Sequence, residues 1–242
     1  MGLFNAVIEL ADDHLVLGHR VSEWCGHAPM LEEDLALPNM ALDLIGTAQT
    51  LYDHAGTLEG TGRDADALAY LRGEREYRNC LLVERPNRDF AHTMLRQLYF
   101  AAFMEPYWQR AIDHPDPVIR GVAGKASKEM AYHIRHTGEW VIRLGDGTDE
   151  SAQRMQDAVD ALHNYTDELF EEGSAQDGLP GRAQIRADWD DTIDHVFEEA
   201  RLTRPATTFP QTGGRDGRHG EGLGHMLAVM QSVHRAHPGA SW

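Results

Sequence analysis

The sequence predicts an all-α protein, and three observations support this fold class. Apolar residues recur every three or four positions along nearly the whole chain of 242 residues, which is the period of an amphipathic helix. No stretch alternates apolar and polar residues between hairpin turns, as paired strands would. The longest helical patterns also come in two pairs, and each pair is connected by a short turn that contains proline.

The first pair of predicted helices covers about residues 5–24 and 31–55. The second of these carries an apolar stripe at the spacing that places side chains on one face of a helix. Pro38, near its start, predicts a kink or a late beginning, because proline lacks the N–H that a helical hydrogen bond needs. The stripe consists of Leu37, Ala41, Leu44, Ala48, Leu51 and Ala55.

The second pair covers about residues 89–113 and 118–144, and Pro106 is expected to bend the first of these two helices. Between the two pairs, only short helical pieces are predicted, near residues 65–83. Two helical hairpins joined by one long crossover are the arrangement of ferritin-like proteins. We therefore predict a ferritin-like four-helix bundle.

Three more helices are predicted after the bundle, at about residues 149–172, 183–203 and 223–235. The first two would cover the bundle from outside. The segment 205–222, which is rich in glycine, is the longest irregular stretch. We expect one ferritin-like domain over residues 1–242, with the core bundle at about 5–145 and the covering helices and C-terminal extension at about 146–242.

The charge balance excludes several classes of partner. The chain has 22 basic and 39 acidic residues, and its formal net charge of -17 disfavours nucleic acids and anionic membranes. No stretch approaches the length of about 18 apolar residues that a membrane span needs. The chain has only two cysteines, so we expect reduced thiols and a cytoplasmic location. Of these, Cys25, beside Trp24, is expected to pack in the core.

The metal ligands typical of a ferritin-like bundle are missing from the sequence. Such a bundle holds two metal ions with Glu-x-x-His pairs from two of its helices. No Glu-x-x-His occurs anywhere in this chain. Leu44 and Thr47 stand where the second helix would need a glutamate and a histidine, and Met130 precedes His133 in the fourth helix. We predict no metal site in this chain.

Glu129 and His133 are four residues apart and can share a helix face. One interpretation is a shifted metal or acid–base pair, which Glu105 could join. The other, which we favour, is a side-chain contact with a hydrogen-bonded core imidazole, because a single histidine and carboxylate are too few ligands. The sequence also lacks a Gly-x-Ser-x-Gly elbow and a phosphate-binding P-loop, so we predict no catalytic residue.

One basic feature lies in the crossover, where arginines recur every three residues. If this segment is helical, Arg72, Arg75 and Arg78 line one face, with Arg85 and Arg88 following. They could receive the phosphates of an anionic ligand. The alternative is a solvated face whose arginines pair with the neighbouring glutamates.

Several long strings resemble a known family. They are EWCGHAPMLEEDLALPNMALDLIGTAQ at 23–49, GEREYRN at 73–79, KEMAYH at 128–133 and TGGRDGRHGEGLGHML at 212–227. Together they resemble the C subunits of 1,2-phenylacetyl-CoA epoxidases over essentially the whole chain. The resemblance implies a ferritin-like subunit that has lost its iron ligands.

The resemblance also implies partners and cofactors outside this chain. A homologous catalytic A subunit would hold the di-iron centre that activates O2 and epoxidises the ring of phenylacetyl-CoA. A small B subunit and a reductase with flavin, an iron–sulfur centre and NADPH would complete the system. The implied substrate contacts are Glu76, Tyr77, Arg78 and Asn79. The resemblance also implies a second contact region after Phe170, around Asp177 and Gly178, but it does not identify individual contact residues there.

Three functional hypotheses follow. The leading one is a non-catalytic structural and substrate-positioning subunit of a multicomponent oxygenase in aerobic phenylacetate degradation, with phenylacetyl-CoA at the subunit interface. The second is a self-sufficient di-metal oxidase with a displaced site around Glu105, Glu129 and His133. The third is a free-standing helical adaptor.

Overall fold

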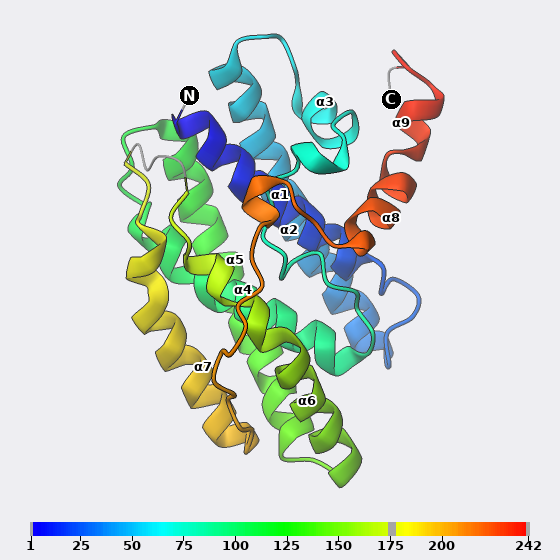
Figure 1. The fold of residues 1–242 in the computed structure, drawn as a ribbon, viewed down its shortest axis with the longest axis vertical. Coiled ribbons are helices and arrows are strands. Elements are labelled where there is room, and N and C mark those ends of the chain that lie inside the picture. Colours follow the sequence, from blue (N-terminus) through cyan, green and yellow to red (C-terminus); the bar gives the residue numbers. More distant parts are fainter. Residues whose placement is uncertain (1, 174–177, 241–242) are drawn as a thin grey trace.

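A computed structural model describes residues 2–173 and 178–240. Within these ranges every regular element is helical, which confirms the predicted fold class (Figure 1). The α-helices are α1 (Gly2–Ser22), α2 (Leu31–Glu59), α3 (Ala65–Tyr70), α4 (Phe90–Arg110), α5 (Pro117–Gly145), α6 (Asp149–Leu162), α7 (Arg186–Ala200), α8 (Glu221–Met230) and α9 (Ser232–Ala236). None of the helices described is long and apolar enough to cross a membrane.

The four long helices form the predicted bundle. Helix α1 packs along α2, and α4 packs along α5, so the chain makes two hairpins. Helix α2 begins at Leu31, so the late start predicted from Pro38 does not occur. Helix α4 continues past Pro106 to Arg110. Each proline removes one backbone N–H donor from its helix, but the helix continues on both sides of it.

The core lies between these helices, and α1 and α4 are both largely enclosed in it. All residues of α1 from 7 to 18 are buried, including the acidic side chains of Glu9, Asp12 and Asp13. Cys25 lies in the turn after α1 and is exposed, so its predicted place in the core is wrong. The helix ends at Ser22, and of the residues that follow, Trp24 packs against the core while Cys25 is exposed.

The crossover between the hairpins contains less helix than predicted. Apart from α3, it has one 3-10 turn, Glu74–Glu76, and no helix follows from Tyr77 to Asp89. Asp12 and Asp13 of α1 and Glu168 each accept one backbone N–H group of this segment, as described below. Because these groups are satisfied without helical bonds, the segment remains extended.

The C-terminal third covers the bundle, as predicted, but in shorter pieces. Helix α6 ends at Leu162, and two 3-10 turns, His163–Tyr165 and Asp167–Phe170, replace the rest of the expected helix. Helices α6 and α7 pack against α4 and α5. The chain then runs back across α1 to the crossover, where α8 and α9 lie (Figure 1).

Candidate anion-binding site

The centre of the bundle, where a ferritin-like protein would hold metal, is mostly apolar. Leu44 and Thr47 are both buried in α2, as the sequence predicts. His133 is buried in α5, where it accepts a hydrogen bond from Gln97 Nε2 at 3.0 Å and donates to Asp43 Oδ2 at 3.2 Å. Its two ring nitrogens are therefore satisfied by protein groups. In residues 2–173 and 178–240, no three or more histidine, cysteine or carboxylate side chains come together as a metal site would require.

Glu129 does not form the pair with His133 that one interpretation of the sequence requires. Its carboxylate lies 3.0 Å from Nζ of Lys125, one turn earlier in α5. Burial raises the pKa of Glu129, and the nearby Asp43 adds to this effect, while Lys125 opposes it. One carboxylate oxygen of Glu129 therefore has a partner within α5.

His14 of α1 is a second imidazole inside the bundle. Its Nδ1 donates to the carbonyl oxygen of Leu10 at 2.7 Å, and its ring packs edge-on against Phe100. Burial lowers the pKa of His14 to about 4. The side chain is therefore neutral at physiological pH, which suits an apolar core.

The crossover is attached to α1 by buried carboxylates. Asp12 accepts hydrogen bonds from the guanidinium of Arg72, from the hydroxyl of Tyr52 and, at 2.7 Å, from the backbone N–H of Arg78. Burial alone would lower the pKa of Arg72, but the Asp12 carboxylate outweighs it, so the pKa is raised. Arg72 is thus a structural cation that is already neutralised.

Asp13 and Glu168 hold the next residues of the crossover. Asp13 accepts from the N–H of Cys80 at 2.7 Å, and Glu168 accepts from the N–H of Leu81 at 2.6 Å. The opposite oxygen of Glu168 accepts from the N–H groups of Gly213 and Gly214 at 2.8 and 2.7 Å. One carboxylate therefore joins two segments that are far apart in the sequence.

We call residues 212–220 the glycine clasp, because they lie against the crossover at very short range. A side chain at Gly214 would overlap the carbonyl oxygen of Asn79. Gly217 has a φ of 76°, and a side chain there would overlap the carbonyl oxygen of Arg75 and lie 2.7 Å from Nη1 of Arg78. Only glycine permits this approach at both positions.

His219 fastens the end of the clasp. Its Nδ1 donates to Glu84 Oε2 at 2.8 Å and its Nε2 donates to the carbonyl oxygen of Tyr77 at 3.1 Å. Burial disfavours the charged ring, but the hydrogen bond to Glu84, the charge of Glu84 and the hydrogen bond to Tyr77 together outweigh this effect and raise the pKa of His219. The protonated ring satisfies both acceptors at once.

An open cleft of about 190 Å³ lies between the crossover and the first turns of α1. Three arginines line it, together with Glu76 and apolar side chains. The other lining residues are Phe4, Asn5, Ile8 and Leu68, and the arginines are Arg63, Arg72 and Arg78. A cluster of guanidinium groups at a cleft is a suitable site for phosphate or carboxylate.

Arg78 is the arginine of the cleft whose charge is available to a ligand. Arg63 pairs with Glu59, and Arg72 pairs with Asp12. Arg78 instead donates through Nη1 to the carbonyl oxygens of Arg75 and Tyr77, both at 2.7 Å. Among the residues that the structure describes, no carboxylate forms an ion pair with it.

The four predicted contact residues occupy two different environments. Arg78 and Glu76 line the cleft, and Glu76 also accepts from the N–H of Gly73 at 2.6 Å. Tyr77 and Asn79 are buried beneath it. The Tyr77 hydroxyl donates to Ala69, and Asn79 Nδ2 donates to Glu84 at 3.0 Å. These two residues therefore support the backbone that carries Arg78.

The predicted arginine face of a helix does not exist. Arg72 follows α3, Arg75 lies in the 3-10 turn, and Arg78 lies in extended chain. Arg72 is buried, whereas Arg75 is exposed. The spacing of the arginines does not produce a shared helix face, because the segment is not helical. The backbone N–H groups of Arg78 and Cys80 donate to the buried carboxylates of Asp12 and Asp13 instead of to helical carbonyl oxygens.

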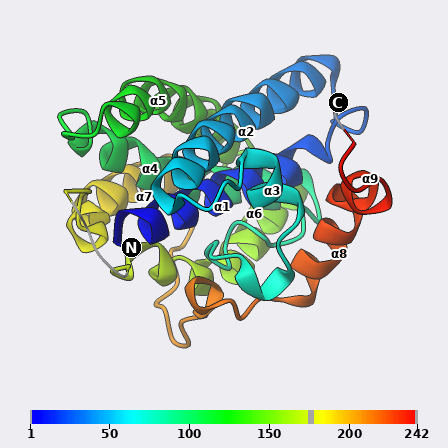
Figure 2. The same cartoon turned by 90° about the horizontal axis from the view of Figure 1, so that it is seen from above.

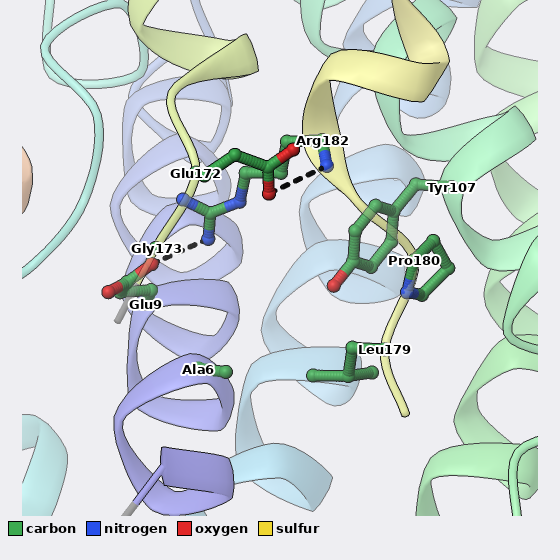
Figure 3. A pocket seen from close by; sticks show the side chains of 8 residues that line it. All are labelled: Ala6, Glu9, Tyr107, Glu172, Gly173, Leu179, Pro180 and Arg182. Atoms are coloured by element: carbon green, nitrogen blue, oxygen red, sulfur yellow. Dashed lines mark hydrogen bonds and ion pairs between the residues drawn. The ribbon is translucent and has the colours of Figure 1, made fainter. Parts of the chain in front are cut away.

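The second predicted region borders α1 on a neighbouring side, shown in Figure 3. A cavity of about 20 Å³ lies there, lined by residues that include Tyr107 and Leu179. Arg182 Nη2 donates to Glu9 Oε2 at 2.6 Å beside it. This volume holds about one water molecule, not an acyl chain. Asp177 lies outside the described residues, and Gly178 approaches the ring of His114.

Sequence reasoning missed the acids that organise the site. Glu9, Asp12 and Asp13 share one side of α1, at the spacing of i, i+3 and i+4. That pattern is a signal for a polar stripe on a helix that is otherwise apolar. The cleft-lining residues Phe4 and Ile8 carry no comparable signal.

Comparison with known proteins gives two matches. A family model described as phenylacetic acid catabolic protein matches residues 1–242. The C subunit of 1,2-phenylacetyl-CoA epoxidase from Escherichia coli (strain K12) is 43% identical over 245 aligned residues, which cover 97% of this chain and 97% of that protein. Both matches confirm the resemblance that the sequence strings indicate.

Proposed function

Because the chain belongs to the family of phenylacetic acid catabolic proteins, we propose that it is a non-catalytic subunit of a 1,2-phenylacetyl-CoA epoxidase. In this proposal it supports the catalytic subunit and positions phenylacetyl-CoA at their interface, in the cytoplasm, during aerobic phenylacetate degradation. The observation that carries the positioning role is the cleft in which Arg78 keeps an uncompensated charge.

The side chains at the bundle centre support the non-catalytic part of this proposal. A di-iron site needs bridging carboxylates and imidazoles from several helices. Here the corresponding α2 positions hold Leu44 and Thr47, and His133 is already bonded to Gln97 and Asp43. These residues do not fit a di-iron centre, so we assign no chemical step to this chain.

The cleft supports the positioning part. Coenzyme A carries phosphate groups, and a guanidinium can donate two parallel hydrogen bonds to phosphate oxygens. A chain with a net charge of -17 repels such an anion at long range, so a local cation is needed where the ligand binds. Arg78 supplies that cation, and Asp12 fixes its backbone through the N–H group.

The partners and cofactors of the proposed complex lie outside this chain. A homologous A subunit would contain the di-iron centre, and a small B subunit and a reductase with flavin, an iron–sulfur centre and NADPH would complete it. What this chain contributes is a rigid surface. The buried ion pairs around Asp12 and Asp13 hold that surface in place before any ligand arrives.

Metal analysis of the purified chain, alone and with the co-expressed A subunit, tests the proposal. We expect substoichiometric iron or manganese in the isolated chain and no turnover of phenylacetyl-CoA with any reductant. Epoxide should form only when the A subunit and the reductase are present. Two tightly bound iron atoms per chain would instead support the displaced-site oxidase, and the absence of a co-purifying bundle subunit would support the free-standing adaptor.

A further inference from the structure

His219 is a titratable residue at the end of the glycine clasp, and its side chain is 0% exposed. It precedes α8 by two positions. In Figure 2 the clasp, drawn in orange, lies beside the teal crossover before the chain enters α8. His219 therefore lies where the clasp meets the segment that carries Arg78.

The His219 ring bridges two acceptors of the crossover, and this bridge depends on the charge of the ring. Nδ1 lies 2.8 Å from Glu84 Oε2, and Nε2 lies 3.1 Å from the carbonyl oxygen of Tyr77. Glu84 also accepts from the side chain of Asn79 and from the N–H of Gly220. Both ring contacts are hydrogen bonds only if both ring nitrogens carry a proton. The imidazolium is therefore the form that fits this position.

Loss of the proton breaks one of these two bonds. A neutral imidazole has one donor and one acceptor. The donor stays with Glu84, because a charged acceptor makes the stronger hydrogen bond. Nε2 then presents a lone pair to the Tyr77 carbonyl oxygen at 3.1 Å, and two acceptors at this distance repel each other. The end of the clasp is therefore pushed away from Tyr77.

The same Tyr77 carbonyl helps to orient the cation of the cleft. Nη1 of Arg78 donates to this oxygen and to the carbonyl oxygen of Arg75, both at 2.7 Å. Gly217 of the clasp lies so close to the Arg75 carbonyl that a side chain there would overlap it. Both acceptors of the Arg78 guanidinium are thus in contact with the clasp. A clasp that moves away leaves this guanidinium less well oriented.

The charges around His219 favour the imidazolium. Burial opposes it, but the contacts with Glu84 and Tyr77 and the charge of Asp12 in α1 together raise the pKa above its usual value of 6.5. In the folded protein the ring therefore keeps its proton above pH 6.5 and loses it as the pH rises through the raised pKa.

The other charged groups near the clasp are bound to groups other than His219. On α8, Glu221 contacts His225. The cations come from α1, from the crossover and from the clasp itself. Arg20 pairs with Glu23, Arg215 with Asp13 and Arg218 with Asp216, and the guanidinium of Arg85 lies over the ring of Tyr165.

We propose that His219 is a positioning residue of the cleft, whose proton holds the glycine clasp against the crossover and keeps Arg78 oriented towards an anionic ligand. The cleft then binds this ligand more tightly when the ring is charged than when it is neutral. Because the proton and the ligand favour the same arrangement, each strengthens the binding of the other. This inference rests on the proposed function for the identity of the ligand, phenylacetyl-CoA.

Titration of the isolated full chain tests the role of the proton without any ligand. Nuclear magnetic resonance of the His219 ring should give a pKa above 6.5. The N–H of Gly220 donates to Glu84 Oε1 at 2.6 Å, next to the ring. This amide should lose protection from hydrogen exchange over the pH range in which the ring loses its proton.

Kinetics of the reconstituted complex test the consequence for the cleft. We expect the KM of the parent for phenylacetyl-CoA to rise about threefold between pH 6.5 and pH 8.5, with little change in kcat. His219→Gln cannot carry the charge, so its KM should be high already at pH 6.5 and should vary less. His225→Gln is the control, because His225 also contacts a glutamate but is exposed on α8. The control should follow the parent.

The remaining outcomes also decide the question. A His219 ring that titrates at or below pH 6.5 would overturn the proposal, as would equal pH profiles of KM for His219→Gln and the parent. A His225→Gln variant that loses the pH dependence would overturn it as well. If His219→Gln does not fold, the ring titration and the Gly220 exchange of the parent decide alone. If both behave as expected but the complex does not turn over phenylacetyl-CoA, the proposed function fails and the proton-dependent clasp stands.

Discussion

The guanidinium of Arg215 donates through Nη2 to the carboxylate of Asp13 at 2.7 Å, although 202 positions separate the two residues in the sequence. Through Nη1 the same group donates to the carbonyl oxygen of Arg78 at 2.8 Å. Burial would lower the pKa of Arg215, but Asp13 outweighs it and the pKa is raised. The glycine clasp thus determines where the backbone of the cleft lies.

Replacing Arg78 with alanine should weaken binding of the acyl-CoA without affecting assembly. A lost charge-assisted hydrogen bond is worth about 1.5–3 kcal/mol when buried, and Arg78 is only half-buried, so we expect the KM of the reconstituted complex to rise about threefold to tenfold. The rise should be larger at low ionic strength, because salt screens the charge. Arg154→Ala, on the outer surface of α6, is the control. Equal KM values for the Arg78 variant and the parent at low salt would reject a ligand role.

Replacing Gly217 with alanine should distort the cleft as well as strain the backbone. Gly60, with a φ of 70°, is left-handed like Gly217 but has no atom within 4 Å of an added Cβ. Gly60→Ala should therefore lower the free energy of unfolding by about 1 kcal/mol, through backbone strain alone. Gly217→Ala should cost about 2–3 kcal/mol, because its Cβ also overlaps the Arg75 carbonyl. Denaturant unfolding measures the free energy of unfolding of both variants. Similar decreases for Gly60→Ala and Gly217→Ala would show that the clasp can move aside.

The buried His14 should make the protein less stable in mild acid. Its pKa is lowered to about 4 in the folded state, whereas it stays near 6.5 in the unfolded chain. Above pH 6.5 the ring is neutral in both states and contributes no pH dependence. As the pH falls from 6.5 towards 4, only the unfolded chain takes up the proton, so stability is lost.

The size of this effect follows from the interval between the two pKa values. At pH 5 the parent should lose about 2 kcal/mol relative to pH 7 through this group. His14→Gln can keep the hydrogen bond to Leu10 but cannot titrate. Between pH 7 and pH 5, the free energy of unfolding of this variant should therefore fall by about 2 kcal/mol less than that of the parent. Parallel pH profiles for the two proteins would show that His14 is not the group responsible.

Restoring metal ligands in α2 should destabilise the fold rather than create a site. Leu44→Glu with Thr47→His would bury an acid and an imidazole without partner ligands, at a cost of several kcal/mol, of the order of 3–5. Thermal unfolding and iron analysis together measure the outcome. Unchanged stability would contradict the inward orientation of both side chains.

The helical bundle can be predicted from the sequence because each helix is specified by the pattern of apolar residues within its own segment. The spacing of apolar residues specifies α1, α2, α4 and α5 within a few residues of their observed ends. The end of α6 at Leu162 is harder to predict. Apolar residues continue at helical spacing beyond it through Leu169, although the backbone there forms 3-10 turns.

The candidate site can be predicted only in part, because its partners are distant in the sequence. The arginine spacing indicates Arg78 as a candidate, but the helix on which it is expected is absent. Asp12 lies 66 positions before Arg78, and Glu168 lies 87 positions after Leu81. Spacing within one segment carries no information about contacts of this kind, and only the fold brings the groups together.

The position of the glycine clasp in the chain has a consequence for biosynthesis. Arg215 leaves the ribosome 137 positions after Arg78, to whose carbonyl oxygen its guanidinium donates. Until then, Glu168 also lacks the N–H groups of Gly213 and Gly214. A nascent chain can thus assemble its helical hairpins early, while the cleft around Arg78 is completed only near the end of translation. The candidate cleft is therefore a late product of folding, and premature termination before the clasp would yield a bundle without it.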